Sequence, residues 1–167
     1  VNVANVSPST GVFVGGAPGS FFKGDIDDAR IYDRELSNSE IRALAGTHPM
    51  QVSTWSPTPA SSSLGFHVAA DSYSNLTDNT VVGNWTDNSG NNFTATQTNN
   101  PVFRTGINGI NGNPAIQFNG TNQYFDAGNT TINFSGLTTF AIAQNQEDYT
   151  SSWSDRAVVS KDNGACT

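Results

Sequence analysis

Short runs in which hydrophobic and polar residues alternate make up most of the chain, and turn-forming residues separate them. Alternation of this kind is the pattern of a strand that buries one face. Strands that recur about every 8–12 residues, with almost no helix between them, indicate an all-β, antiparallel sandwich. The segments predicted to contain strands are residues 1–6, 12–14, 24–36, 64–71, 80–97, 113–128, 138–146 and 156–164.

The segment GDIDDARIYDREL, residues 24–36, has the clearest alternation. A regular strand places Ile26, Asp28, Arg30 and Tyr32 on one face, and Asp27, Ala29 and Ile31 on the other. We expect Ala29 and Ile31 to point into the core and Arg30 to point outward.

One short helix is predicted at residues 37–45. Ser37 followed three residues later by Glu40 forms a capping box, in which each side chain satisfies a free amide at the helix start. Leu36 is placed to pack against Ile41, and Leu44 continues the apolar stripe. Gly46 is suited to the end of the helix.

Beyond the helix, residues 47–63 contain three prolines and many small polar residues, which is typical of a linker or an extended surface segment. Two later turns are also predicted. Asn119–Gly120 favours a tight hairpin between two strands. Asp87 and Gly90 predict a polar turn. The segment also resembles the start of a calcium-binding loop, but the glutamate expected near the twelfth position of such a loop is absent.

The composition narrows the class of protein. The formal charge is −7 and only 13% of residues are charged, so no basic stripe is present to bind nucleic acid. No apolar run approaches the roughly 20 residues that span a bilayer. Cys166 is the only cysteine, which excludes an internal disulfide. Abundant Asn, Ser, Thr and Gly are typical of secreted β-proteins, so we expect an extracellular or cell-surface location.

The sequence resembles a known family in two places. FFKGDIDDARIYDRELSNSEIRAL, residues 21–44, is similar to the closing strand and helix of laminin G-like, concanavalin A-like jelly-roll domains of bacterial surface proteins. LGFHVAADS, NWTDNSGNNFTATQ and GINGNPAIQFNGTNQYFDAG are similar to the opening half of such a domain. The resemblance implies an antiparallel jelly-roll sandwich, in which the first and last strands are neighbours.

The order of these motifs is inverted relative to the family. The chain therefore divides into a closing part at residues 1–46, the linker at 47–63 and an opening part at 64–167. Two interpretations stay open: a slice of a tandem-repeat protein, or a unit in which residues 1–46 complete the sandwich of the same or a neighbouring copy. We expect residues 1–46 to pair with strands from elsewhere in the same chain or from another copy. A 46-residue fragment is too small for a core of its own, and its strand edges would stay unpaired.

The resemblance also implies a structural Ca²⁺ site. In related jelly rolls the aspartate at the position of Asp27 reaches a calcium ion that backbone carbonyls complete, and Asp25 is a second candidate ligand. Calcium takes 6–8 oxygen ligands, so a carboxylate with carbonyls and water is a workable shell. The alternative is that these aspartates only protect a sheet edge against aggregation.

The residues give no support for an enzyme. Glu35, Glu40 and Glu147 lack the spacing of a glycosidase pair, and mid-strand His67 is expected to be a packed or surface histidine. Trp55 and Trp153, each flanked by polar residues, are candidate carbohydrate-binding rings.

The sequence predicts a non-enzymatic extracellular adhesion or structural module of a large repetitive surface protein, with a fibre-forming subunit as one form of it. Its expected partners are glycans, other cell-surface proteins or neighbouring copies joined by strand exchange, without membrane insertion. The alternative is a calcium-dependent carbohydrate-binding module attached to a secreted enzyme.

Overall fold

The computed structural model describes residues 11–45, 63–128, 137–146 and 157–161, and the statements below refer to these residues. The strand predicted at residues 1–6, most of the linker and the helix stop at Gly46 lie outside them. Among the described residues, no helix is long and apolar enough to cross a bilayer.

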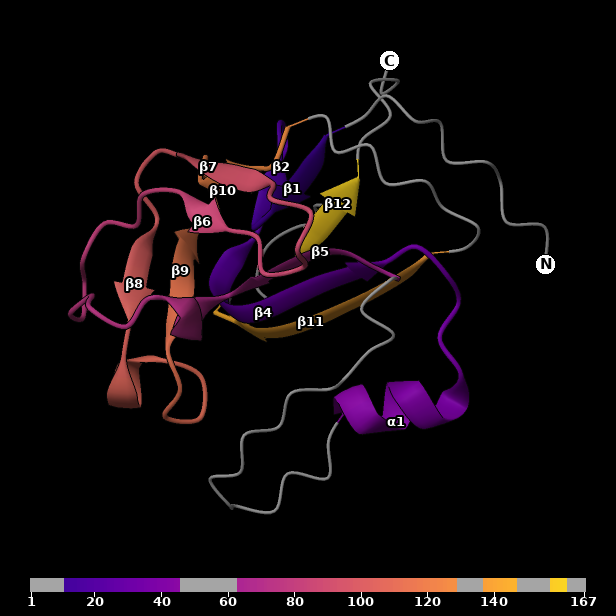
Figure 1. The fold of residues 1–167 in the computed structure, drawn as a ribbon. Coiled ribbons are helices and arrows are strands. Elements are labelled where there is room, and N and C mark those ends of the chain that lie inside the picture. Colours follow the sequence, from indigo (N-terminus) through magenta and orange to yellow (C-terminus); the bar gives the residue numbers. More distant parts are fainter. Residues whose placement is uncertain (1–10, 46–62, 129–136, 147–156, 162–167) are drawn as a thin grey trace.

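Two antiparallel five-stranded sheets pack together and form a β-sandwich (Figure 1). The all-β fold class with one short helix is thereby confirmed. The first sheet has the order β12 (Val159–Lys161), β1 (Val12–Val14), β10 (Tyr124–Asp126), β7 (Thr94–Thr98), β6 (Trp85–Thr86). The second has the order β11 (Thr138–Asn145), β4 (Lys23–Tyr32), β9 (Ala115–Asn119), β8 (Val102–Arg104), and β5 (Leu64–Ala69) also pairs with β4.

The remaining elements are small. Strands β2 (Gly16–Ala17) and β3 (Ser20–Phe21) form a two-stranded sheet of their own. The helix α1 spans Asn38–Ala45, and two short 3₁₀ helices, η1 (Ala70–Ser72) and η2 (Gly106–Asn108), follow β5 and β8.

Strand β4 organises the second sheet. It pairs with β11 along one side, and along the other side first with β9, up to Ile26, and then with β5, from Asp28 onward. The change of neighbour coincides with a bulge: Ile142 lies opposite Asp28 and Ala143 opposite Ile26, so Asp27 is an extra residue. Asp27 therefore sits where β4, β5 and β9 meet.

The bulge changes which side chains of β4 face the core. Regular alternation placed Ile26 opposite to Ala29 and Ile31, and this prediction is wrong, because all three are buried in one core cluster. The extra residue Asp27 shifts the alternation by one position. Arg30 points away from this core, as predicted, but it is buried rather than exposed.

The core lies between the two sheets and is built from both. Trp85 and Phe125 of the first sheet pack edge to face with ring centroids 5.2 Å apart. Phe125 also packs against Phe118 of the second sheet at 6.0 Å. Trp85 is fully buried, and its indole N–H donates to the carbonyl of Ala69 at 3.0 Å.

The helix confirms its predicted cap. The amide of Ser37 donates to the Glu40 carboxylate at 2.9 Å, and the amide of Glu40 faces the Ser37 hydroxyl at 3.4 Å. Ile41, which was predicted to pack against Leu36, is 46% exposed and lies outside the buried cluster. Leu36 instead forms a second core cluster with Leu44, Tyr32 and Leu64, so the helix packs against the outer face of the second sheet.

The segment at residues 113–128 differs from its prediction. Both strands form, but β9 belongs to the second sheet and β10 to the first, so they are not the arms of a hairpin. The Asn119 side chain accepts the amides of Thr121 and Asn122 at 2.9 and 3.2 Å, which turns the chain from one sheet to the other.

The turn at residues 87–93 is confirmed. Asp87 is buried, and its carboxylate accepts the amides of Ser89 and Phe93 at 2.9 and 3.3 Å. It also accepts the amide of His67 at 2.9 Å, which ties the turn to β5. Gly90 has φ +92°, a conformation that glycine adopts without strain.

Candidate functional site

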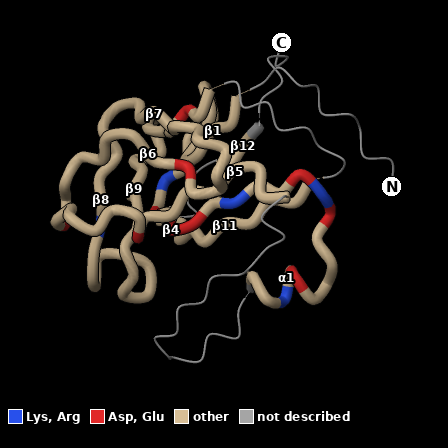
Figure 2. Tube along the Cα trace, in the orientation of Figure 1, with Lys and Arg blue, Asp and Glu red and all other residues tan. Residues whose placement is uncertain are grey.

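Charged residues are sparse in the described chain, and half of them lie along β4 and the segment that leads into α1 (Figure 2). Within β4, three aspartates follow in close succession: Asp25, Asp27 and Asp28. The bulge gives them different surroundings. Asp25 and Asp27, the two predicted calcium ligands, interact with different side chains: Asp25 with Gln146, Arg104 and Gln117, and Asp27 with Asp28, Asp71 and Arg30.

Asp27 is half-buried at the junction of three strands. Burial, which has the largest effect, and the charges of Asp28 and Asp71 together raise the pKa of its carboxyl to about 7, while Arg30 acts in the opposite direction. Asp71 lies in η1, which directly follows β5. The fold thus brings two carboxylates from distant parts of the sequence close enough to repel each other.

The surroundings of Asp27 fit a hard cation in part. Carboxylate oxygens are ligands that calcium prefers, and a bound cation would relieve the repulsion between them. The described residues contain no group of three or more His, Cys, Asp or Glu side chains that could hold a metal ion. Backbone carbonyls and water would therefore have to complete a calcium shell at this junction.

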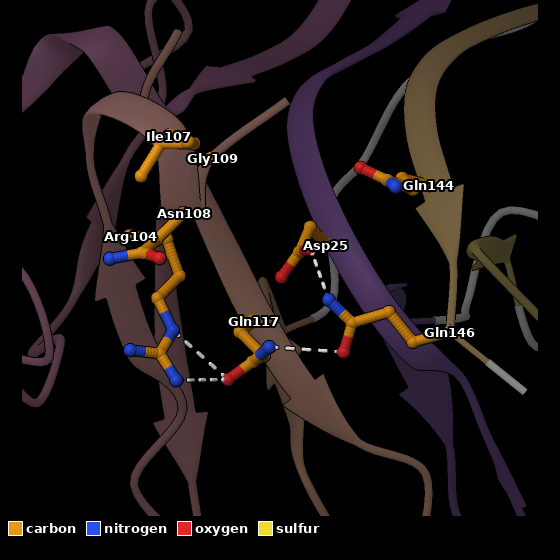
Figure 3. A pocket seen from close by; sticks show the side chains of 8 residues that line it. All are labelled: Asp25, Arg104, Ile107, Asn108, Gly109, Gln117, Gln144 and Gln146. Atoms are coloured by element: carbon orange, nitrogen blue, oxygen red, sulfur yellow. Dashed lines mark hydrogen bonds between the residues drawn. The ribbon is translucent and has the colours of Figure 1, made fainter. Parts of the chain in front are cut away.

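Asp25 lies at a pocket on the outer face of the second sheet (Figure 3). Alternate residues of a strand face opposite sides of the sheet, so the neighbours of a core residue point into this pocket. Gln117 lies between buried Ile116 and Phe118, and Asp25 precedes buried Ile26. This Asp25 pocket has a volume of about 330 Å³ and is lined by Asp25, Arg104, Ile107, Asn108, Gly109, Gln117, Gln144 and Gln146.

A chain of hydrogen bonds crosses the floor of the Asp25 pocket. The Arg104 guanidinium donates from Nε and Nη2 to Oε1 of Gln117, at 3.0 and 2.7 Å. The Gln117 amide donates to Oε1 of Gln146 at 3.0 Å, and the Gln146 amide donates to Oδ2 of Asp25 at 2.5 Å. The network joins β8, β9, β4 and the end of β11.

The Asp25 carboxylate is only half satisfied by this network. The residue is 1% exposed, and its Oδ1 atom is buried without a hydrogen-bond partner in the described structure. Burial raises its pKa above the ordinary value, although the Gln146 hydrogen bond, the Arg104 charge and nearby Gln117 all lower it. Figure 3 shows the second oxygen of Asp25 directed toward the side of Gln117 and Arg104.

A separate ionic cluster occupies the other half of β4. Arg30 donates to both oxygens of Asp28, with the shortest contact at 2.6 Å, and His67 of β5 approaches Asp28 to 3.3 Å. Burial opposes ionisation of Asp28, but His67 and Arg30 hold its pKa below the ordinary value. His67 is thus a packed histidine within the sheet, as predicted.

The proposed carbohydrate-binding rings Trp55 and Trp153 lie outside the described residues, as do Glu147 and Cys166. Sequence reasoning did not identify Arg104, Gln117 or Gln146. The only signal for Gln117 and Gln146 is a polar residue within a predicted strand segment, and Arg104 lies in β8, a strand that the sequence analysis did not predict. Strand pairing, which the sequence does not reveal, is what brings them to Asp25.

Comparisons of the chain with protein-family models, with curated proteins and with solved structures found no match.

Proposed function

We propose that the chain is a non-enzymatic extracellular module that serves adhesion or builds a fibre, as part of a repetitive surface protein with laminin G-like jelly-roll domains. One observation carries the proposal: β4, whose sequence resembles a closing strand, pairs with β5, whose sequence resembles an opening strand. The register runs from Asp28 opposite Ala69 to Tyr32 opposite Leu64. Neighbouring first and last strands are what such a domain requires.

The acidic, charge-poor composition of the chain supports an extracellular role without nucleic acid. The two described glutamates are not arranged as a catalytic pair. Glu40 caps α1 and pairs with Arg34 at 2.6 Å, and Glu35 is exposed. The expected partners are glycans or proteins at cell surfaces.

Adhesion is tested with beads that carry the purified full chain. We expect the beads to bind cells or an array of glycans and matrix proteins, and soluble chain to compete. Absence of binding by a chain whose fold is verified by circular dichroism would contradict adhesion. Release of reducing sugars from a panel of polysaccharides would contradict the non-enzymatic assignment.

The fibre-forming variant depends on how β4 finds its partners. In the structure β4 pairs with strands of its own chain, but the same pairing can join two copies by strand exchange. Light scattering coupled to size exclusion, over a wide concentration range, distinguishes the two forms. Exchange predicts oligomers that persist on dilution, and a monomer at every concentration would argue against a fibre.

We also propose that calcium binds at Asp27, with Asp71 and backbone carbonyls of the β4–β5–β9 junction as further ligands. A cation bound only to the folded chain raises the melting temperature, and chelator should reverse the increase. Asp27→Asn should abolish the calcium response without lowering the melting temperature in chelator, because the amide is not repelled by Asp28 and Asp71. Glu35→Gln, at an exposed position, is the control, and a wild-type melting temperature that ignores calcium would refute the site.

A further inference from the structure

The Asp25 pocket has the size and the position of a ligand site. Its volume of about 330 Å³ falls at the lower end of the range of roughly 300–1,000 Å³ that is usual for small-molecule sites. It opens on the outer face of a sheet whose other face packs against the core. A small ligand or a single unit of a larger one would fill it.

The floor of the pocket contains an unsatisfied acceptor. Oδ1 of Asp25 is buried and receives no hydrogen bond in the described structure, while Oδ2 is held by Gln146. Native proteins pair nearly all such atoms, and each exception calls for a reason. A ligand that donates a hydrogen bond to Oδ1 would supply the missing partner.

The charges around the pocket select against charged ligands. A cationic ligand would meet the Arg104 guanidinium, and an anionic ligand would meet the Asp25 carboxylate in a chain whose net charge is −7. The side-chain amides of Gln117, Gln144 and Gln146 each offer both a donor and an acceptor. A hydroxyl group also donates and accepts, so a neutral polyhydroxylated ligand matches this lining.

The rim adds one apolar contact. Ile107, in η2, lines the pocket and is 97% exposed, which leaves its whole side chain available to a ligand. A pyranose ring has hydroxyl groups around its edge and C–H groups on its faces. It can therefore hydrogen-bond to the floor while one face covers Ile107.

We propose that the Asp25 pocket binds one neutral sugar residue, with a ring hydroxyl donating to Oδ1 of Asp25 and the Gln144 and Gln146 amides contacting its neighbours. Because Oδ1 is shielded from solvent, the Gln117 amide turns aside to admit the hydroxyl. This proposal rests on the proposed function in one respect, the expectation that the partners of the chain are glycans. The site itself differs from the tryptophan rings and from the calcium junction.

The test uses the full chain and a panel of neutral methyl glycosides, with glucuronic acid, glucosamine and spermidine as charged probes. Saturation-transfer NMR detects binding, and titration gives the affinity. We expect at least one neutral glycoside to bind and Asp25→Asn to weaken it about tenfold or more, because an acceptor in a charged hydrogen bond is lost. Preference for a charged probe, or no binding by the whole neutral panel, would overturn the proposal.

Exposed positions keep the test independent of folding. Gln144→Ala and Ile107→Ser alter exposed lining residues and should weaken binding severalfold at an unchanged melting temperature. Thr139→Ala, exposed on the same strand β11 but outside the pocket, and Ile41→Ser, exposed on α1, are their matched controls. Equal affinity of all four variants and the wild type would place the ligand elsewhere and refute the pocket.

The outcomes separate this inference from the proposed function. Cell or glycan adhesion that Gln144→Ala and Asp25→Asn leave unchanged would refute the pocket and leave the adhesive function standing. A glycoside that binds in the pocket of a chain without any adhesion would confirm the pocket and refute adhesion.

Discussion

At the scale of single residues, the feature that positions Asp25 is the close approach of two backbones beside it. Gly24 has φ +151°, and a Cβ atom built on it would lie 2.1 Å from the carbonyl oxygen of Gln144. Only glycine allows β4 and β11 to pair at this distance. The pocket therefore depends on a residue that contributes no side chain to it.

Gly24→Ala should accordingly destabilise the fold, by about 2–4 kcal/mol for the strained dihedral and the backbone clash together. Gly83→Ala is the matched control, because a Cβ at Gly83 meets no atom within 4 Å, and we expect a change below about 0.5 kcal/mol. Urea unfolding of both variants measures the difference. Equal stability of the two would mean that β11 does not approach β4 as described.

Single residues also show what the sequence can predict. Asp87 was assigned correctly, because an aspartate followed by a glycine strongly favours a turn, where its carboxylate accepts backbone amides. Ile26 was placed on the wrong face, because alternation carries no sign of the bulge at Asp27. A one-residue bulge inverts every position beyond it.

At the scale of elements, the helix α1 is held by one face against the second sheet. Leu44 is 8% exposed and packs with Leu36, Tyr32 and Leu64, whereas Ile41 is 46% exposed. Leu44→Ala should lower the free energy of unfolding by about 2–4 kcal/mol, and Ile41→Ala by less than about 1 kcal/mol. Chemical denaturation of both variants tests this, and a larger effect at Ile41 would contradict the docking face.

The start of the helix predicts a dependence on pH. Hydrogen bonds from Arg34, and then from Ser37, lower the pKa of Glu40 from 4.5 to about 2. Because the folded pKa is the lower one, the contribution of Glu40 is complete above about pH 4.5 and is lost as pH falls toward 2.

NMR titration of the Glu40 carboxyl should therefore find a midpoint well below the ordinary glutamate value of 4.5. The Glu40→Gln variant should show faster amide exchange than the wild type in the first turn of α1 at neutral pH, and the difference should vanish near pH 2. A normal Glu40 midpoint would show that the cap and the Arg34 pair do not persist in solution.

Elements also mark where prediction from sequence ends. Every strand predicted within the described residues forms, since alternation reports burial directly. The hairpin expected at Asn119–Gly120 does not form, because a turn signal says that the chain reverses but not which sheet the next strand joins. The Asp25 pocket was missed for the same reason: its residues meet only through the pairing of β8, β9, β4 and β11.

At the scale of the whole molecule, the first described strands are interior strands of both sheets. β1 lies between β12 and β10, and β4 lies between β11 and the pair β9 and β5. The main core cluster therefore combines six buried residues from positions 12–31 with eleven from positions 66–127. The two parts of the sequence therefore depend on each other to form both sheets and this core.

This dependence predicts that the molecule assembles from two pieces. Residues 1–46 and 64–167, produced together as separate chains, should copurify as a one-to-one complex, because β4 supplies hydrogen bonds to three strands and buries Ile26, Ala29 and Ile31. Ile26→Asp in the short chain should abolish the complex, since it buries an unpaired charge. Ile41→Asp, at an exposed helix position, should leave it intact. Pieces that stay apart, or a complex that survives Ile26→Asp, would show that β4 does not complete the sheet.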